Sequence, residues 1–356
     1  MCIASRCSRL NQVYGGGHVA DIGGKAYSTQ MYQSGLANLV IATGWAHRLA
    51  DYSLMPGRVV ALLPNAGLAN KLFVWAKAEV FAQLNDMPND TIGWTWPKIG
   101  PLLRGERNLR MYGRYFRSRK NDLLIALATG SFIRRIVIEP EVGRLPRSGF
   151  GSRTYVFKDI PSWRDLFGDI RNHRDFIRDR LLAMIRDQYK KELDALRTPI
   201  VSVHVRRGDF RRLRLGEDFA LVGGVRTADQ YFADLIEQIR YVSGRDLPIT
   251  VFSDGSDDEV AFLTRMPGVT RSPATSDVVD LLLMARSRII ITSAGSTFGE
   301  WAAFLSQAAV LRHPARVLAP IRPPQYTELY YEGPAPAKPR DWSGLLLSNV
   351  REIRPG

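Results

Sequence analysis

Two adjacent arginines follow an apolar run near the middle of the chain. Residues 200–205 are mostly β-branched and predict a buried strand, and Arg206, Arg207, Gly208 and Asp209 come directly after it. Paired guanidinium groups supply several donors and the positive charge that a diphosphate requires, without a metal. Asp209 could orient an arginine or accept a proton. The alternative is a surface salt-bridge corner, and the residue types gathered at one strand end favour a ligand site.

A second group of polar residues ends the predicted strand 249–253. The run 252–255 reads Phe-Ser-Asp-Gly, which places the carboxylate of Asp254 just beyond the strand. This carboxylate could accept a hydrogen bond from a ribose or a guanine edge, or pair with a neighbouring arginine. Asp-Gly is also a strong turn dipeptide, so this segment taken alone favours a plain turn.

A third group follows the predicted strand 288–292. A Ser/Gly/Thr turn opens the predicted helix 298–306, with Ser296 or Thr297 at the cap. The free backbone N–H groups and the dipole of such a helix end attract anions, although simple capping explains the same residues. Because ligands of parallel sheets bind beyond the carboxyl ends of strands, we expect all three groups to meet at one sheet edge.

These groups need a parallel sheet to position them. Strands at 200–205, 249–253, 288–292 and 308–311 alternate with helices at 227–243, 278–286 and 298–306. An earlier strand (58–63), a small-residue turn and a helix (72–84) form the opening of a similar unit. Further strands are predicted at 134–139 and 154–158, loops over 85–105 and one long helix over 173–196. We therefore predict an α/β protein with two Rossmann-like domains facing a cleft.

Composition shifts divide the chain into four parts. We expect an N-terminal extension without a fold (1–57), with Met55 as the true start, although a genuine flexible arm is the alternative. Residues 58–198 form one α/β domain and residues 199–320 a second, separated where Pro199 ends a helix. The last part, 321–356, is rich in proline and is expected to be mostly irregular.

Composition also excludes several classes of protein. The 356 residues include only two cysteines, Cys2 and Cys7, which rules out a disulfide framework and a cysteine-based zinc site. The sequence contains no run of eighteen apolar residues, so it predicts no membrane-spanning helix. The net charge of +14 is compatible with nucleic acid, a membrane surface or an anionic small molecule, but no nucleic-acid motif accompanies it. We expect a cytoplasmic protein that binds no nucleic acid and contacts the inner membrane peripherally.

The run 204–210, His-Val-Arg-Arg-Gly-Asp-Phe, closely resembles a motif of the α-1,2-fucosyltransferases. The run 252–254 is similar to that family's Phe-Ser-Asp-Asp motif. Residues 280–284 with 296–301 resemble its Asp-Leu-x-Leu-Met … Ser-Thr-Phe-x-x-Trp block. Residues 67–73 resemble its Gly-Leu-Gly-Asn-Gln-Leu-Phe opening. The four matches fall in the family's order over residues 58–312.

The resemblance implies a GT-B-like fold, with residues 58–198 as the acceptor-side domain and residues 199–320 as the GDP-fucose-binding domain. It also implies metal-independent, inverting transfer of L-fucose from GDP-fucose to a galactoside or another saccharide hydroxyl, with an α-1,2 linkage and no cofactor. It implies roles for ten residues. His204, Arg206 and Asp209 would be catalytic, Arg206, Arg207, Asp254, Asp280, Ser296 and Thr297 would bind the donor, and Gly67 and Asn70 would border the cleft.

The chain departs from the family pattern at Ala69, Lys71, Gly255 and the pair Gly299-Glu300. Two alternatives therefore stay open beside the fucosyltransferase. One is a related transferase for another nucleotide sugar, because arginines that bind phosphates do not select the hexose. The other is an inactive protein that binds a GDP-sugar.

Overall fold

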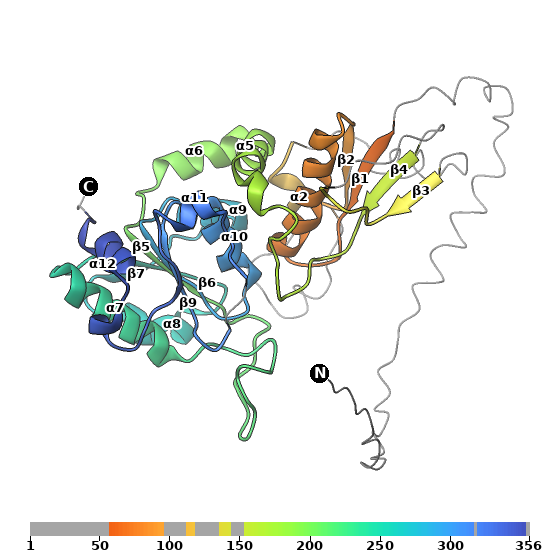
Figure 1. Ribbon diagram of the computed structural model, residues 1–356. Helices are drawn as coiled ribbons and strands as arrows, with labels where there is room; N and C mark the ends of the chain where they lie inside the picture. Colours follow the sequence, from red (N-terminus) through yellow and green to blue (C-terminus); the bar gives the residue numbers. More distant parts are fainter. Residues whose placement is uncertain (1–56, 96–111, 118–134, 144–152, 317–318, 354–356) are drawn as a thin grey trace, which may run out of the picture. The chain divides into compact units, whose positions relative to one another are not determined.

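The computed structural model describes residues 57–95, 112–117, 135–143, 153–316 and 319–353 (Figure 1). The expected extension, 1–57, lies outside the described residues except for Gly57. The described chain contains two parallel sheets with helices packed against them, so the predicted α/β class with two Rossmann-like sheets is confirmed. No helix among the described segments is long and apolar enough to cross a membrane.

The N-terminal sheet has the order β2-β1-β4-β3, and every pair in it is parallel. Strand β1 (Arg58–Leu62) leads into helix α2 (Leu68–Leu84), which begins four residues before the predicted start at residue 72. Strand β2 (Asn89–Ile92) was expected as loop. It is polar, and it forms because its backbone pairs with β1 and Asp90 pairs with Arg58. Strands β3 (Arg135–Ile138) and β4 (Arg153–Phe157) lie close to their predicted positions.

The C-terminal sheet has the order β10-β9-β8-β5-β6-β7, again all parallel. Chain order runs from β5 (Val201–Val205) through β6 (Ile249–Ser253) to β7 (Val269–Arg271) on one side. It then returns to the other side of β5 with β8 (Ile289–Ile291) and β9 (Ala309–Arg312). The strand order therefore reverses between β5 and β8, which is where open α/β sheets bind ligands.

Helices cover both faces of this sheet (Figure 1). Helices α7 (Asp229–Ser243), α8 (Asp257–Thr264) and α12 (Gly344–Arg351) share one apolar cluster with Val201 and Val203. Helices α9 (Asp277–Ala285) and α10 (Thr297–Leu305) share the other cluster with Ile290 and Val310. That second cluster continues into α2, where Phe73 lies 5.0 Å from Trp301 of α10 between ring centroids.

Two local expectations need correction. The long helix predicted at 173–196 is two helices, α5 (Arg174–Met184) and α6 (Asp187–Ala195), because Ile185 is extended at φ −69° and ψ 136° and is fully buried. Helix α8 and strand β7 were not predicted. The signal for α8 was present, since Ser256 and Glu259 form a capping box at its start.

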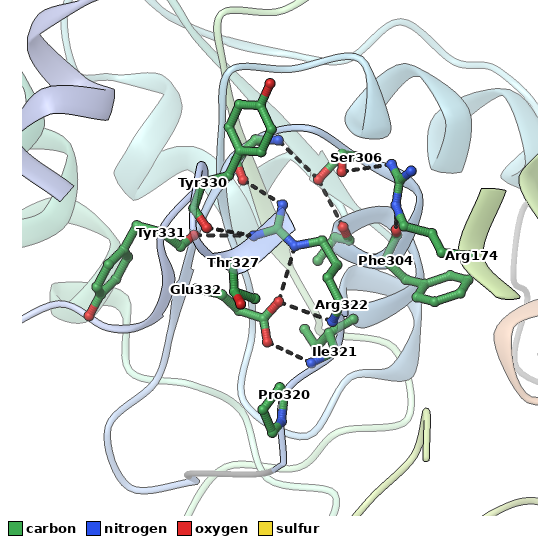
Figure 2. A network of polar contacts seen from close by, with 12 residues as sticks. Arg174, Phe304, Ser306, Pro320, Ile321, Arg322, Thr327, Tyr330, Tyr331 and Glu332 are labelled. Carbon is green, nitrogen blue, oxygen red and sulfur yellow. Dashed lines mark hydrogen bonds and ion pairs between the residues drawn. The ribbon is translucent and has the colours of Figure 1, made fainter. Parts of the chain in front are cut away.

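The proline-rich end of the chain was expected to be irregular, and the structure differs. It contains α11 (Pro324–Thr327), β10 (Glu332–Pro334) and α12. Figure 2 shows what holds it: Arg322 is fully buried and donates to the carbonyl oxygens of Ala308 and Tyr331, at 2.8 and 3.2 Å, and to Glu332 at 3.1 Å. Composition predicted loops here because these contacts join residues whose types carry no local pattern.

The same network fixes the end of α10. Arg174 is buried and donates to the carbonyl oxygens of Phe304, Leu305 and Ser306 at 2.6, 2.6 and 2.9 Å (Figure 2). A cation at this end of a helix satisfies carbonyls that have no partner within the helix and complements its dipole. The opposite end of α10 therefore has a fixed position, and it lies at the carboxyl edge of the sheet.

Candidate functional site

Three polar segments meet at the carboxyl edge of the C-terminal sheet. Strand β5 is central, and the register pairs Val205 with Ser253 of β6 and Val203 with Ile291 of β8. Residues 206–210, 254–255 and 292–297 thus follow neighbouring strands. Direct contacts join them: the backbone N–H of Arg206 donates to Ser293 Oγ, and that of Arg207 to Asp254 Oδ1, both at 2.8 Å.

Arg206 is the arginine of the pair that reaches the surface. Its side chain is 20% exposed and lies between two carboxylates, pairing with Asp209 and, at 2.5 Å, with Asp254. The guanidinium also lies 5.4 Å from the ring centroid of Phe210. These contacts hold a planar fork of donors at the sheet edge, where an anion could replace the half-exposed carboxylate of Asp209.

Arg207 points into the protein instead. Its side chain is 2% exposed, pairs with Asp229, and lies over the ring of Phe262. It also donates to the carbonyl oxygens of Thr227 and Glu259 at 3.4 Å. Burial lowers the pKa of Arg207, and the negative charge of Asp229 acts in the opposite direction. The two arginines predicted to act together on a diphosphate thus have different surroundings.

We expect Arg207→Ala to destabilise the protein by about 2–4 kcal/mol, because it leaves a cavity and buried carbonyls without a donor. Denaturation in urea at neutral pH measures the change. Arg226→Ala is the matched control, since Arg226 pairs with Glu259 at 2.7 Å but its side chain is 25% exposed, so its loss should cost less than about 1 kcal/mol. Equal losses in the two variants would contradict the structural role of Arg207.

Two glycines permit this close packing. A Cβ atom on Gly208 would lie 2.2 Å from Asp254 Oδ2, and one on Gly255 would lie 2.8 Å from the Cβ and Cγ atoms of Arg207. Gly255 stands where the resemblance implies a second aspartate. The structure supplies a physical reason for the departure, because any side chain there would collide with Arg207.

His204 lies under the site without a polar partner on one nitrogen. The residue is 4% exposed, its Nδ1 has no hydrogen-bond partner, and its ring lies 5.4 Å from that of Phe298. Burial lowers its pKa to about 3, helped by the charge of Arg206. The imidazole is therefore neutral at pH 7 and a poor proton acceptor.

Helix α10 begins at the same edge. Ser296 is its N-cap residue and is buried, its side chain makes no capping hydrogen bond, and Thr297 is the first helical residue. Gly299 brings the helix close to β5, since a Cβ atom there would lie 3.0 Å from His204 Nδ1. The first-turn N–H groups of a helix in this position form an anion-binding end.

Sequence reasoning missed two of the residues that hold this edge together. Ser293 accepts from the Arg206 N–H and donates to the His204 carbonyl at 2.8 Å, and Thr227 Oγ1 accepts from the Ala294 N–H at 2.9 Å. Ser293 directly follows the predicted strand 288–292, so its position at a strand end could have identified it. Thr227 carried none, because it comes from the loop before α7.

Asp280 lies at the start of α9, beyond β7. It accepts hydrogen bonds from Thr275 Oγ1 at 2.6 Å and Ser272 Oγ at 3.3 Å. Burial raises its pKa to about 6, the hydroxyl of Thr275 opposes this, and the charge of Asp277 adds to it. Both hydrogen bonds lie within the β7–α9 segment, and in the described part of the chain no side-chain hydrogen bond joins Asp280 to the arginine pair.

The raised pKa of Asp280 makes stability depend on pH. The folded state favours the protonated carboxyl, so the penalty for ionising it is absent below about pH 4 and complete above about pH 6. We expect Asp280→Asn to stabilise the protein by up to about 3 kcal/mol at pH 7.5 and by much less at pH 4.5. Urea denaturation at both values checks this, with the exposed Asp258→Asn as control. A gain that is equal at the two pH values would contradict it.

Gly67 and Asn70 belong to the N-terminal sheet. Gly67 is the N-cap residue of α2, and a Cβ atom there would meet no other atom within 4 Å. Asn70 lies in the first turn of α2, and its buried Oδ1 has no hydrogen-bond partner. Among the described residues, no hydrogen bond or ion pair joins either one to the cluster around Arg206. In the parts of the chain that the structure describes, no group of His, Cys, Asp and Glu could hold a metal ion.

Comparisons with known proteins give one family match. Residues 162–312 match the model of Glycosyl transferase family 11. No curated protein sequence matches the chain significantly.

Solved structures are similar at low identity. The NodZ α-1,6-fucosyltransferase soaked with GDP-fucose is 14% identical with a TM-score of 0.45, covering 72% of this chain and 95% of that one. The structure of fucosyltransferase NodZ from Bradyrhizobium is 15% identical with a TM-score of 0.46, and the coverage of both chains is the same. A mutant of FUT1 from Arabidopsis thaliana in complex with GDP is 13% identical with a TM-score of 0.37, and the match covers 84% of this chain and 76% of the FUT1 chain. The part of this chain that matches Glycosyl transferase family 11 is thus the part that contains Arg206, Asp254, Asp280 and Ser296.

Proposed function

We propose that the protein is a fucosyltransferase that transfers L-fucose from GDP-fucose to a hydroxyl group of a saccharide, with inversion and without a metal. The observation that carries the proposal is the partly exposed Arg206 at the reversal of strand order. It lies within the segment that matches Glycosyl transferase family 11. The α-1,2 linkage, the galactoside acceptor and the cytoplasmic location are proposed on the sequence motifs and composition.

Arg206 would stabilise the departing diphosphate. Negative charge grows on the leaving group as the bond to the sugar breaks, so donors already aimed at it lower the barrier. Arg206 is positioned by its own N–H on Ser293 and by Asp254 against its guanidinium. The first turn of α10, with Ser296 and Thr297, would add backbone N–H groups to the phosphates.

Asp209 is the group we propose for proton transfer. It is half exposed, whereas the pKa of His204 near 3 makes the imidazole a poor base. When the diphosphate takes over the contact with Arg206, the carboxylate of Asp209 loses that cation and can accept the proton of the attacking hydroxyl. His204 would then shape the floor of the pocket.

Arg207 and Asp254 would act as positioning residues in this scheme. Arg207 is buried, and Asp254 holds both the Arg207 backbone and the Arg206 side chain. A direct contact of Asp254 with the nucleoside, which the sequence motif implies, would require it to exchange one of these partners. Gly67 and Asn70 are proposed to border the acceptor from the domain 58–198, and Asp280 to support the donor pocket through the β7–α9 segment.

Chelation gives a simple test of the metal-free scheme. We expect transfer activity to survive excess EDTA, because a guanidinium and a helix end take up the charge of the leaving group. Initial rates with and without EDTA, and after adding back Mn²⁺, measure this. Loss of activity on chelation with rescue by Mn²⁺ would contradict the scheme.

The donor is tested by thermal denaturation with a panel of nucleotide sugars. A ligand at a hundredfold its Kd stabilises the folded state by about 2.7 kcal/mol. We expect GDP-fucose and GDP to raise the Tm, and UDP-sugars to have no effect. Arg206→Ala should remove the shift. An equal response to UDP compounds, or no response to any nucleotide, would overturn the proposal.

A further inference from the structure

A loop shortly after the arginine pair has three leucine side chains that are exposed to solvent. Residues 211–225 project from the C-terminal sheet as the green loop in Figure 1. Leu215 is fully exposed, Leu221 is 83% exposed and Leu213 is 43% exposed. Single exposed leucines are common, but three within nine residues at the tip of one loop need an explanation.

The loop has defined internal contacts. Backbone hydrogen bonds of 2.9 Å, from the Arg211 N–H to Gly224 and from the Arg226 N–H to Arg211, close its base. Both terminal nitrogens of Arg211 donate to the carboxylate of Glu217, at 2.6 and 2.7 Å. Arg316 donates to the Phe219 carbonyl at 3.1 Å. The exposed leucines therefore lie on a loop whose conformation is fixed by hydrogen bonds and an ion pair.

Arginines flank two of the three leucines in the sequence. Arg212 and Arg214 are exposed and alternate with Leu213 and Leu215. Of the two acidic residues in the loop, Glu217 pairs with Arg211, and Asp218 keeps its charge while accepting from the Ala220 N–H at 2.8 Å, so three arginines against two acids leave the loop a net charge of +1. Apolar side chains at a protruding tip, with guanidinium groups beside them, are the combination that inserts at a membrane surface.

We propose that the loop 211–225 docks the protein on an anionic lipid bilayer, with Leu213, Leu215 and Leu221 in the headgroup region and Arg212 and Arg214 on lipid phosphates. A convex tip suits a soft bilayer, whereas a stable protein interface needs about 800 Å² on each partner. The chain's net charge of +14 attracts it to the same surface. Membrane docking does not depend on the proposed function, although it would place Arg206 near a saccharide carried on lipid.

Co-sedimentation of the full chain with vesicles tests the proposal. We expect binding to vesicles of phosphatidylcholine with 30% phosphatidylglycerol (roughly the anionic content that attracts basic segments) and little binding to phosphatidylcholine alone. Leu215→Ser with Leu221→Ser should weaken binding about tenfold or more, since leucine burial is lost. Arg212→Gln with Arg214→Gln should weaken it about 30-fold, from roughly 1 kcal/mol for each arginine.

Matched control variants distinguish binding through the loop 211–225 from non-specific binding by other exposed leucines and arginines. Leu329→Ser changes an exposed leucine elsewhere, and Arg265→Gln with Arg288→Gln removes the same charge from other exposed positions. Both controls should bind as the unaltered chain does. The Tm and the GDP-induced shift of every variant should be unchanged, which keeps this test apart from that of the donor. No binding to either vesicle, or equal losses in loop and control variants, would overturn the proposal.

Discussion

Arg206→Lys is expected to lower kcat about a hundred- to a thousandfold while the Tm stays within a few degrees. Lysine keeps the positive charge but loses the planar fork that can hold two phosphate oxygens at once. One preorganised donor to a developing charge contributes about 2.7–4 kcal/mol to the transition state. Lysine can still pair with the partly exposed carboxylates of Asp209 and Asp254, so the loss of stability should be small. Single-turnover rates with GDP-fucose and thermal denaturation measure the two effects.

Arg207→Lys is the matched control, one residue away. Arg207 is buried against Phe262 and paired with Asp229, so its replacement should lower the Tm and leave turnover per folded molecule within about tenfold. The neighbouring arginines should therefore give opposite results. A lower Tm with near-normal turnover in Arg206→Lys would contradict the role that we propose for Arg206.

The second large effect concerns stability. We expect Arg322→Met to destabilise the protein by about 3–5 kcal/mol, because Arg322 is fully buried and its loss leaves the carboxylate of Glu332 buried without its cation. Turnover per folded molecule should stay normal. Arg322 contacts the Ala308 carbonyl, at the amino end of β9, whereas the candidate site lies at the carboxyl edge.

A double variant tests the reason for that loss. Glu332→Gln removes the unpaired charge and can still accept the N–H of Ile321, which now donates to Glu332 at 2.6 Å. We expect Arg322→Met with Glu332→Gln to regain at least half of the lost stability in urea denaturation. A loss below about 1 kcal/mol in the single variant would mean that the buried pair contributes little.

Strand ends were the most predictable feature of this chain. The apolar runs before Arg206 and Asp254 and after Arg286 predicted β5, β6 and β8, and the rule that parallel strands share a carboxyl edge brought their polar residues together. The sequence also placed Ser296 and Thr297 at the start of α10. These features depend on local patterns that a sequence displays directly.

Features that depend on distant partners could not be predicted. Nothing in the pair Arg206-Arg207 indicates that the second arginine turns inward, because its partner Asp229 lies 22 residues away. The proline-rich end was expected to be loop, since the contacts of Arg322 with Ala308 and Glu332 have no sequence signature. Strand β2 was missed because the pairing with β1, rather than its own residues, makes it a strand.

The most direct test of the account is sugar transfer by the full chain. The protein is incubated in EDTA with radiolabelled GDP-fucose and a panel of galactosides, and the labelled product and released GDP are measured. We predict a fucosylated galactoside and an equal amount of GDP, at least about a hundredfold less of both with Arg206→Lys, and no product from UDP-sugars. Transfer from another nucleotide sugar with none from GDP-fucose, or full activity of Arg206→Lys, would contradict the account.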